Sequence, residues 1–139
     1  MSTRAIVGVT QKDGKFLGAW QWSDGGTILD ILNRKFNTDE TVKELLSVGA
    51  WQIMLGPRQW KEYCDYINKQ YGWPIPEHIT VNNVYFKKES YCANKPTVYK
   101  NIIDAANEDI NYVYVYDSKN HKWKKYDSWK LIQGKYDLK

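Results

Sequence analysis

Two segments, one near each end of the chain, carry the alternating pattern of a β-hairpin, and this pattern constrains the fold most. In the first segment, residues 5–22, apolar residues recur at every second position from Ala5 to Val9, and Asp13-Gly14 is a strong signal for a tight turn. One face of the return strand is expected to hold Phe16, Gly18, Trp20 and Trp22. Since Gly18 stands between aromatic residues, it leaves room for a neighbour or a ligand.

The second segment, residues 111–127, repeats this alternation with tyrosine and valine. Tyrosines at 112, 114 and 116 share one face, and valines at 113 and 115 share the other. The sequence therefore predicts a second hairpin close to the C-terminus.

The region between the hairpins is predicted to be mostly helical, with Thr27 and Thr38 as N-caps and Gly72 as a helix end. The predicted helices span residues 27–36, 37–49, 56–72 and 95–109. The remaining segments are a short strand or buried link at 50–57, a rigid extended connection at 73–78, and a strand at 79–88 that Asn82-Asn83 interrupts.

This order of elements predicts an α+β fold in a single domain, residues 1–139. Helices and strands do not alternate regularly, so we expect a mainly antiparallel sheet built from the N- and C-terminal hairpins. We expect the two hairpins to pair through the strand near residue 80, with the helices on one face of the sheet.

Aromatic residues are unusually abundant, with 7 Trp and 11 Tyr in 139 residues. Such an excess is typical of interfaces and ligand pockets, because these side chains combine a large apolar body with a polar group. We therefore predict a homo-oligomer, and ligand stacking as the second use of these rings.

The sequence offers little for catalysis or metal binding. His78, His121, Cys64 and Cys92 are far apart and match no zinc-ligand spacing, and no nucleophile motif or Walker-type loop is present. We expect a protein that is not an enzyme, with no metal and no cofactor. The N-terminus has no apolar run of about seven residues and the chain has none of about 20, so a cytoplasmic protein without membrane contact is expected.

The stretch GAWQWSDGG, residues 18–26, is the candidate binding site. Two tryptophans precede an Asp-Gly-Gly turn, and a helix is expected to begin at Thr27. Indoles stack on nucleobases, and free backbone N–H groups at a helix start bind anions, so this combination suits a nucleotide. The alternative is a packed corner, in which the indole of Trp22 lies under the helix and the glycines only turn the chain.

Arginine is scarce in a chain with 17 lysines, so each arginine is a candidate for the planar fork that recognises phosphate. Arg4 lies close to the first strand, whereas Arg34 and Arg58 also fit exposed helix positions. The predicted ligand-binding residues are Arg4, Trp20, Trp22, Asp24, Gly25, Gly26, Thr27, Arg34 and Arg58.

Three pieces of the sequence resemble a family of small phage and prophage proteins, the anti-Thoeris sponge proteins. They are MSTRA with the hairpin and its Asp-Gly loop, the helical stretch ILDILNRKFNTDETVKELLSVGA at 28–50, and YVYVYDSKNHKWKKYD at 112–127. Members of the family commonly carry His-Trp-Asp-Gly-Tyr where this chain has QWSDGG at 21–26. Arg4, Trp22, Asp24 and Gly25 are the positions to which the resemblance extends.

The resemblance implies an oligomeric protein that sequesters cyclic ADP-ribose-type immune signals, or cyclic oligonucleotides, without cleaving them in the infected bacterial host. Two other classes stay open. One is a protein-binding inhibitor of a bacterial defence system, similar to an anti-CRISPR protein, whose aromatic residues cover a partner. The other, less favoured, is a single-strand nucleic-acid binder that uses the seven lysines from Lys119 to Lys139.

Overall fold

A computed structural model describes residues 2–138 of the chain, and both predicted hairpins are present in it. At the N-terminus, β1 (Ala5–Thr10) pairs antiparallel with β2 (Phe16–Gln21). At the C-terminus, β7 (Tyr112–Asp117) pairs antiparallel with β8 (Lys122–Asp127). Both hairpins form because the alternation of their residues matches the two-residue repeat of a strand.

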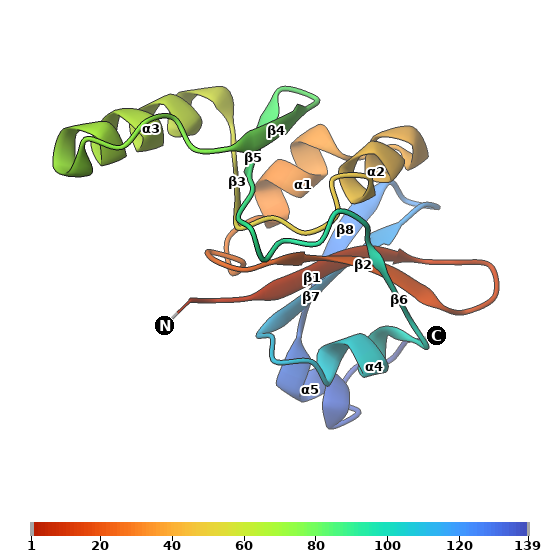
Figure 1. The fold of residues 1–139 in the computed structure, drawn as a ribbon. Coiled ribbons are helices and arrows are strands. Elements are labelled where there is room, and N and C mark those ends of the chain that lie inside the picture. The colour runs from red at the N-terminus through yellow and green to blue at the C-terminus, as the bar shows by residue number, and fades with distance from the viewer. Residues whose placement is uncertain (1, 139) are drawn as a thin grey trace.

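The two hairpins join directly, through a parallel pairing of β1 with β7 (Figure 1). With β6 (Thr97–Tyr99) at one edge, they form a five-stranded sheet in the order β6-β2-β1-β7-β8. The expected α+β class with a mainly antiparallel sheet is confirmed. Part of the segment predicted as a helix at 95–109 is strand β6, and only α4 (Ile102–Ala106) is helical there.

The prediction that a strand near residue 80 links the hairpins is wrong. Asn82 and Asn83 have φ angles of 49° and 62°, the left-handed values of a two-residue hairpin turn. The segment therefore folds back as β4 (His78–Val81) and β5 (Val84–Lys87). With β3 (Ile53–Leu55) they form a separate three-stranded sheet in the order β3-β5-β4.

Helices cover both faces of the five-stranded sheet, which corrects the expectation of helices on one face (Figure 1). α1 (Leu29–Lys35) and α2 (Asp39–Leu46) lie on one side, and α4 and α5 (Ser128–Ile132) lie on the other. The physical reason is that β1 is apolar on both of its faces, so each face needs a cover.

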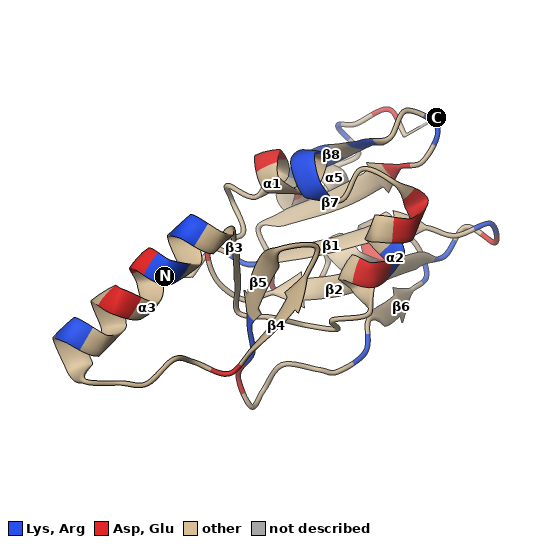
Figure 2. Cartoon of the chain, turned by 90° about the horizontal axis from the view of Figure 1, so that it is seen from above, with Lys and Arg blue, Asp and Glu red and all other residues tan. Residues whose placement is uncertain are grey.

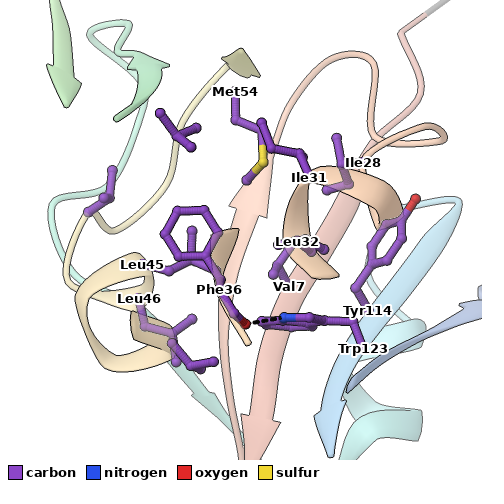
Figure 3. Close-up of a cluster of buried hydrophobic side chains, with 14 of the residues drawn as sticks. Val7, Ile28, Ile31, Leu32, Phe36, Leu45, Leu46, Met54, Tyr114 and Trp123 are labelled. Atoms are coloured by element: carbon purple, nitrogen blue, oxygen red, sulfur yellow. Dashed lines mark hydrogen bonds between the residues drawn. The ribbon is translucent and has the colours of Figure 1, made fainter. Parts of the chain in front are cut away.

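The larger core lies under α1 and α2, where Leu32, Phe36 and Leu45 are fully buried (Figure 3). Trp123 of β8 joins this core, and its indole Nε1 donates a hydrogen bond of 2.7 Å to the carbonyl oxygen of Phe36. The smaller core on the α4 side contains Ile6 and Phe16, with Trp20 packed at its margin.

Two of the predicted helix boundaries are confirmed by their capping contacts. The side chain of Thr38 accepts a hydrogen bond from the amide of Thr41 at the start of α2. α3 (Pro57–Tyr71) begins after Gly56 and ends at Gly72, whose φ of 69° is the left-handed value that favours glycine.

α3 projects away from the five-stranded sheet, and acidic and basic residues alternate along it (Figures 1 and 2). Its base is anchored by Trp60, whose ring stacks on Tyr85 of β5 at a centroid distance of 5.5 Å. Within residues 2–138, no helix is long and apolar enough to cross a membrane.

Candidate functional site

The two tryptophans of the predicted site lie together at the end of β2, on the α4 side of the sheet. The ring centroids of Trp20 and Trp22 are 4.8 Å apart, and the ring of Tyr91 meets Trp22 edge-on at 5.2 Å. Trp20 Nε1 donates a 2.8 Å hydrogen bond to the hydroxyl of Tyr99, which fixes the inner indole. Arg4 completes the group that we call the tryptophan shelf, which comprises Arg4, Trp20, Trp22, Tyr91 and Tyr99.

Arg4 lies beside the outer indole. The guanidinium carbon is 5.9 Å from the ring centroid of Trp22, and Nη1 contacts a carboxylate oxygen of Asp109 at 2.9 Å. The Arg4 backbone is held on both sides by Asn111, since its amide donates to the Asn111 side chain and its carbonyl accepts from the Asn111 amide. A guanidinium has five N–H donors, so the contact with Asp109 leaves most of them available.

The indole N–H of Trp22 is buried and has no hydrogen-bond partner among the described residues. Leaving such a donor unpaired costs on the order of 1–3 kcal/mol. The Tyr91 ring beside it is 52% exposed, so the shelf combines a fixed inner part with an accessible outer part. The shelf therefore offers aromatic area, a cationic fork and an unused donor.

The Asp-Gly-Gly turn is a packed corner. The Gly25 amide donates to the Thr3 carbonyl at 2.9 Å, and the Gly25 carbonyl accepts from the Tyr114 hydroxyl at 2.6 Å. A Cβ atom on Gly25 would lie 2.8 Å from the Cβ of Ala5, so glycine is needed for the close approach of the chain to β1. The Gly26 carbonyl accepts from Lys125 Nζ at 2.6 Å.

The helix start at this corner differs from the prediction. Thr27 does not cap α1; the N-cap is Ile28, without a side-chain hydrogen bond. The Tyr114 hydroxyl, which donates to the Gly25 carbonyl, also lies close to the Ile28 backbone. The backbone donor at Gly25, which was expected to be free for an anion, is therefore taken up by a contact within the protein.

Three of the predicted residues line a cavity on the opposite side of the sheet from the indoles. Asp24, Thr27 and Arg34 contribute to a pocket of about 220 Å³ beside α1, in whose walls neither Trp20 nor Trp22 takes part. Arg34 is held by an ion pair of 2.8 Å with Asp30, four residues earlier. The structure thus brings the predicted residues together as two groups, not one.

Arg58 belongs to neither group. It lies in the first turn of α3, where it pairs with Glu62 at 3.3 Å and its side chain is 91% exposed. This is the exposed helix position that the sequence offered as the alternative reading.

Sequence reasoning missed several residues that surround the candidate site: Tyr91, Tyr99, Asp109, Tyr114 and Lys125. The aromatic alternation of residues 112–116 could have drawn attention to Tyr114, but nothing local connects it with a loop 89 residues away. Within residues 2–138, no group of three or more His, Cys, Asp or Glu side chains is arranged to hold a metal ion.

The comparisons with known proteins give no relative. No protein-family model, no curated protein and no solved structure matches the chain. The candidate function therefore depends on the chemistry of the shelf and on the sequence resemblance.

Proposed function

We propose that this protein binds and sequesters a small cyclic nucleotide of the ADP-ribose type at the tryptophan shelf, without cleaving it. One observation carries the proposal: the indole of Trp22 lies beside the Arg4 guanidinium, 5.9 Å from ring centroid to guanidinium carbon, and its buried N–H has no partner in the described part of the chain. An aromatic face with an adjacent cation matches the two parts of a nucleotide, its flat base and its phosphate.

In this proposal each side chain of the shelf has its own role. The base stacks on the outer indole, with the exposed ring of Tyr91 as a side wall. Arg4 contacts the phosphate with the donors that Asp109 leaves free, since Arg binds phosphate in a forked geometry. A small movement on binding gives the Trp22 N–H an acceptor from the ligand, which removes the cost of its unpaired state.

The proposal does not use the backbone of the Asp-Gly-Gly turn, because the Gly25 amide and carbonyl already have partners. It also leaves out the Thr27 and Arg34 side chains, which line the pocket on the other side of the sheet. The proposed ligand-binding residues are therefore Arg4, Trp20, Trp22 and Tyr91. Of these four, Tyr91 was not among the residues predicted from the sequence.

Sequestration in the cytoplasm of an infected bacterium, as a counter-defence function, follows from the resemblance to the anti-Thoeris sponge proteins and is part of the proposal. A sponge needs a tight site and no reaction. The shelf supports this reading because it supplies recognition groups: aromatic faces, one cationic fork and one N–H donor.

The experiment that tests this function measures retention and release of a ligand. The protein is incubated with a cyclic ADP-ribose isomer, freed of unbound ligand by rapid gel filtration, and heated; the supernatant is analysed by mass spectrometry. We expect the intact cyclic compound to be retained by the wild type and lost from Trp22→Ala. A linear product would show an enzyme, and no retention of any cyclic ADP-ribose isomer would overturn the proposal.

Arg58→Ala is the matched control for the cationic part, because Arg58 lies on α3 outside the shelf. Arg4→Ala should lower retention, whereas Arg58→Ala should leave it unchanged. Equal losses in both variants would mean that the ligand responds to overall charge and not to the shelf.

A further inference from the structure

β4 is an edge strand of the three-stranded sheet: it pairs with β5 on one side and with no strand of residues 2–138 on the other. Val81 and Val84 flank the two-residue turn, so they exchange hydrogen bonds with each other, and bonds to β5 recur at every second residue. The Glu77 carbonyl, which accepts from the Lys88 amide at 2.9 Å, continues this series. The N–H and C=O groups of His78 and Thr80 therefore point away from β5, toward the open edge.

The edge of the five-stranded sheet at β8 is protected in ways that the β4 edge is not. The amide of Trp123 is capped by the Asn33 side chain of α1 at 2.8 Å, and exposed lysines at 122 and 124 would repel an identical strand. β4 has the sequence HITV, with no lysine, proline or carboxylate. None of the hydrogen bonds described for residues 2–138 occupies the outward groups of His78 and Thr80.

Exposed apolar side chains accompany this open edge. Ile79 in the strand is 40% exposed, and Trp73 and Ile75 in the connection from α3 are 57% and 67% exposed. The connection runs back along α3, on the part of the molecule that projects from the five-stranded sheet (Figures 1 and 2). An open strand edge and an apolar surface are thus combined in one projecting region, a combination typical of interaction sites.

We propose that two copies of this chain pair antiparallel through β4, with the two-fold axis between the two Ile79 residues. In this register His78 of each copy lies opposite Thr80 of the other, and each such pair exchanges both backbone hydrogen bonds. Ile79 then forms a non-hydrogen-bonded pair with its own counterpart, where side chains are closest, and loses its exposed apolar surface.

The identical partner is favoured by the side chains of β4. β4 contains no lysine, arginine, aspartate or glutamate, so the symmetric pairing has no repulsion between like charges to overcome. Ile79, which is 40% exposed, meets its own copy across the axis, so the pairing covers an apolar side chain on both partners.

The first test removes the backbone N–H of Thr80, which points toward the open edge of β4. Thr80→Pro deletes an N–H that faces the open edge, where proline is tolerated within a monomer, and Thr80→Val keeps the N–H as the matched control. Light scattering at high micromolar concentration should show a dimer for the wild type and Thr80→Val, and a monomer for Thr80→Pro. Circular dichroism on the same samples should show an unchanged fold. A wild-type monomer, or a dimer that persists in a folded Thr80→Pro, would overturn the proposal.

The second test determines which residues of the two β4 strands lie opposite each other. In a Cys64→Ser background, Ile79→Cys should form a disulfide-linked dimer under mild oxidation, because the two Cβ atoms face each other across the axis. Thr80→Cys should not, because its opposite residue is His78 of the other copy. Cross-linking of Thr80→Cys in place of Ile79→Cys would contradict the register. Neither test uses a nucleotide, so both stand or fall independently of the proposed function.

Discussion

The indole half and the loop half of the segment from Gly18 to Ile28 are held in opposite ways. In the loop half, Gly25 is bonded to Thr3 and Tyr114 through its amide and carbonyl, and the Gly26 carbonyl is bonded to Lys125. In the indole half, the N–H of Trp22 has no partner among residues 2–138, and the ring lies beside a cationic side chain, Arg4. Residues that are adjacent in sequence are therefore held differently: the loop by contacts of Gly25 and Gly26 within the protein, and the indole of Trp22 with a donor that has no partner among residues 2–138.

This difference shows that glycines before a helix do not by themselves make an anion site. Such a site needs amides without partners, and here the Gly25 amide donates to the Thr3 carbonyl. Mutations on the two halves should separate accordingly: changes in the loop should affect stability, and changes on the shelf should affect binding.

The largest expected effect comes from Gly25→Val. The new Cβ would lie 2.8 Å from the Ala5 side chain and 3.1 Å from the Thr3 carbonyl oxygen, and neither neighbour can move without displacing β1. We expect a loss of about 3 kcal/mol of unfolding free energy, at the upper end of overpacking effects. Chemical denaturation of the variant measures it.

Gly26→Ala is the control for that variant, since a Cβ there would make only ordinary contacts at 3.5 Å. It should change the unfolding free energy by less than about 1 kcal/mol. If Gly25→Val were as stable as the wild type, the loop would not be the packed half of the segment.

The next effect concerns Tyr114, which holds the loop through its hydroxyl. Burial raises the pKa of Tyr114 to about 12. An unfolded tyrosine ionises near pH 10, so the contribution of Tyr114 to stability is fully present below pH 10 and is lost as the pH rises through 12. The expected loss is about 2–3 kcal/mol between these two values.

Tyr114→Phe sharpens this prediction because it removes the titrating group. Denaturation at a series of pH values should give a smaller alkaline loss for Tyr114→Phe than for the wild type, together with a deficit of about 1–2 kcal/mol at neutral pH from the lost hydrogen bond to Gly25. Parallel curves for the two proteins would mean that the hydroxyl does not stay protonated in the loop.

The smallest effect is expected for Thr27→Ala. Its side chain caps nothing, because the N-cap of α1 is Ile28, so the unfolding free energy should change by less than about 0.5 kcal/mol. Thr38→Ala provides the contrast, since Thr38 accepts a hydrogen bond from the Thr41 amide and its loss should cost about 1 kcal/mol. Melting curves of both variants show which one loses more stability. A larger loss in Thr27→Ala than in Thr38→Ala would mean that Thr27 does cap α1.

The parts of the fold that could be predicted from sequence are those with local causes. The Asp13-Gly14 turn and the alternation beside it define the first hairpin, and Thr38 and Gly72 mark helix ends through contacts a few residues away. The Asn82-Asn83 pair also carried a local signal, since asparagine tolerates left-handed φ values, and reading it as a turn gives the β4–β5 hairpin.

The parts that could not be predicted depend on contacts between distant residues. The parallel pairing of β1 with β7 joins residues more than 100 positions apart. It places β1 in the interior of the sheet, and because β1 is apolar on both faces, both faces are covered by helices. The same pairing brings Tyr114 under the loop. The sequence thus identified Arg4, Trp20 and Trp22 as candidates, but it could not show that Thr27 and Arg34 lie on the other side of the sheet.

The most direct test of the central claim is isothermal titration calorimetry of Trp22→Ala and Thr27→Ala with the cyclic ADP-ribose isomer that the wild type retains. We expect Trp22→Ala to weaken binding by about tenfold to a hundredfold, since base stacking on an aromatic residue contributes on the order of 1–3 kcal/mol. Thr27→Ala should bind as the wild type does. Unchanged affinity in a folded Trp22→Ala, or a comparable loss in Thr27→Ala, would contradict the division of this segment into a binding half and a structural half.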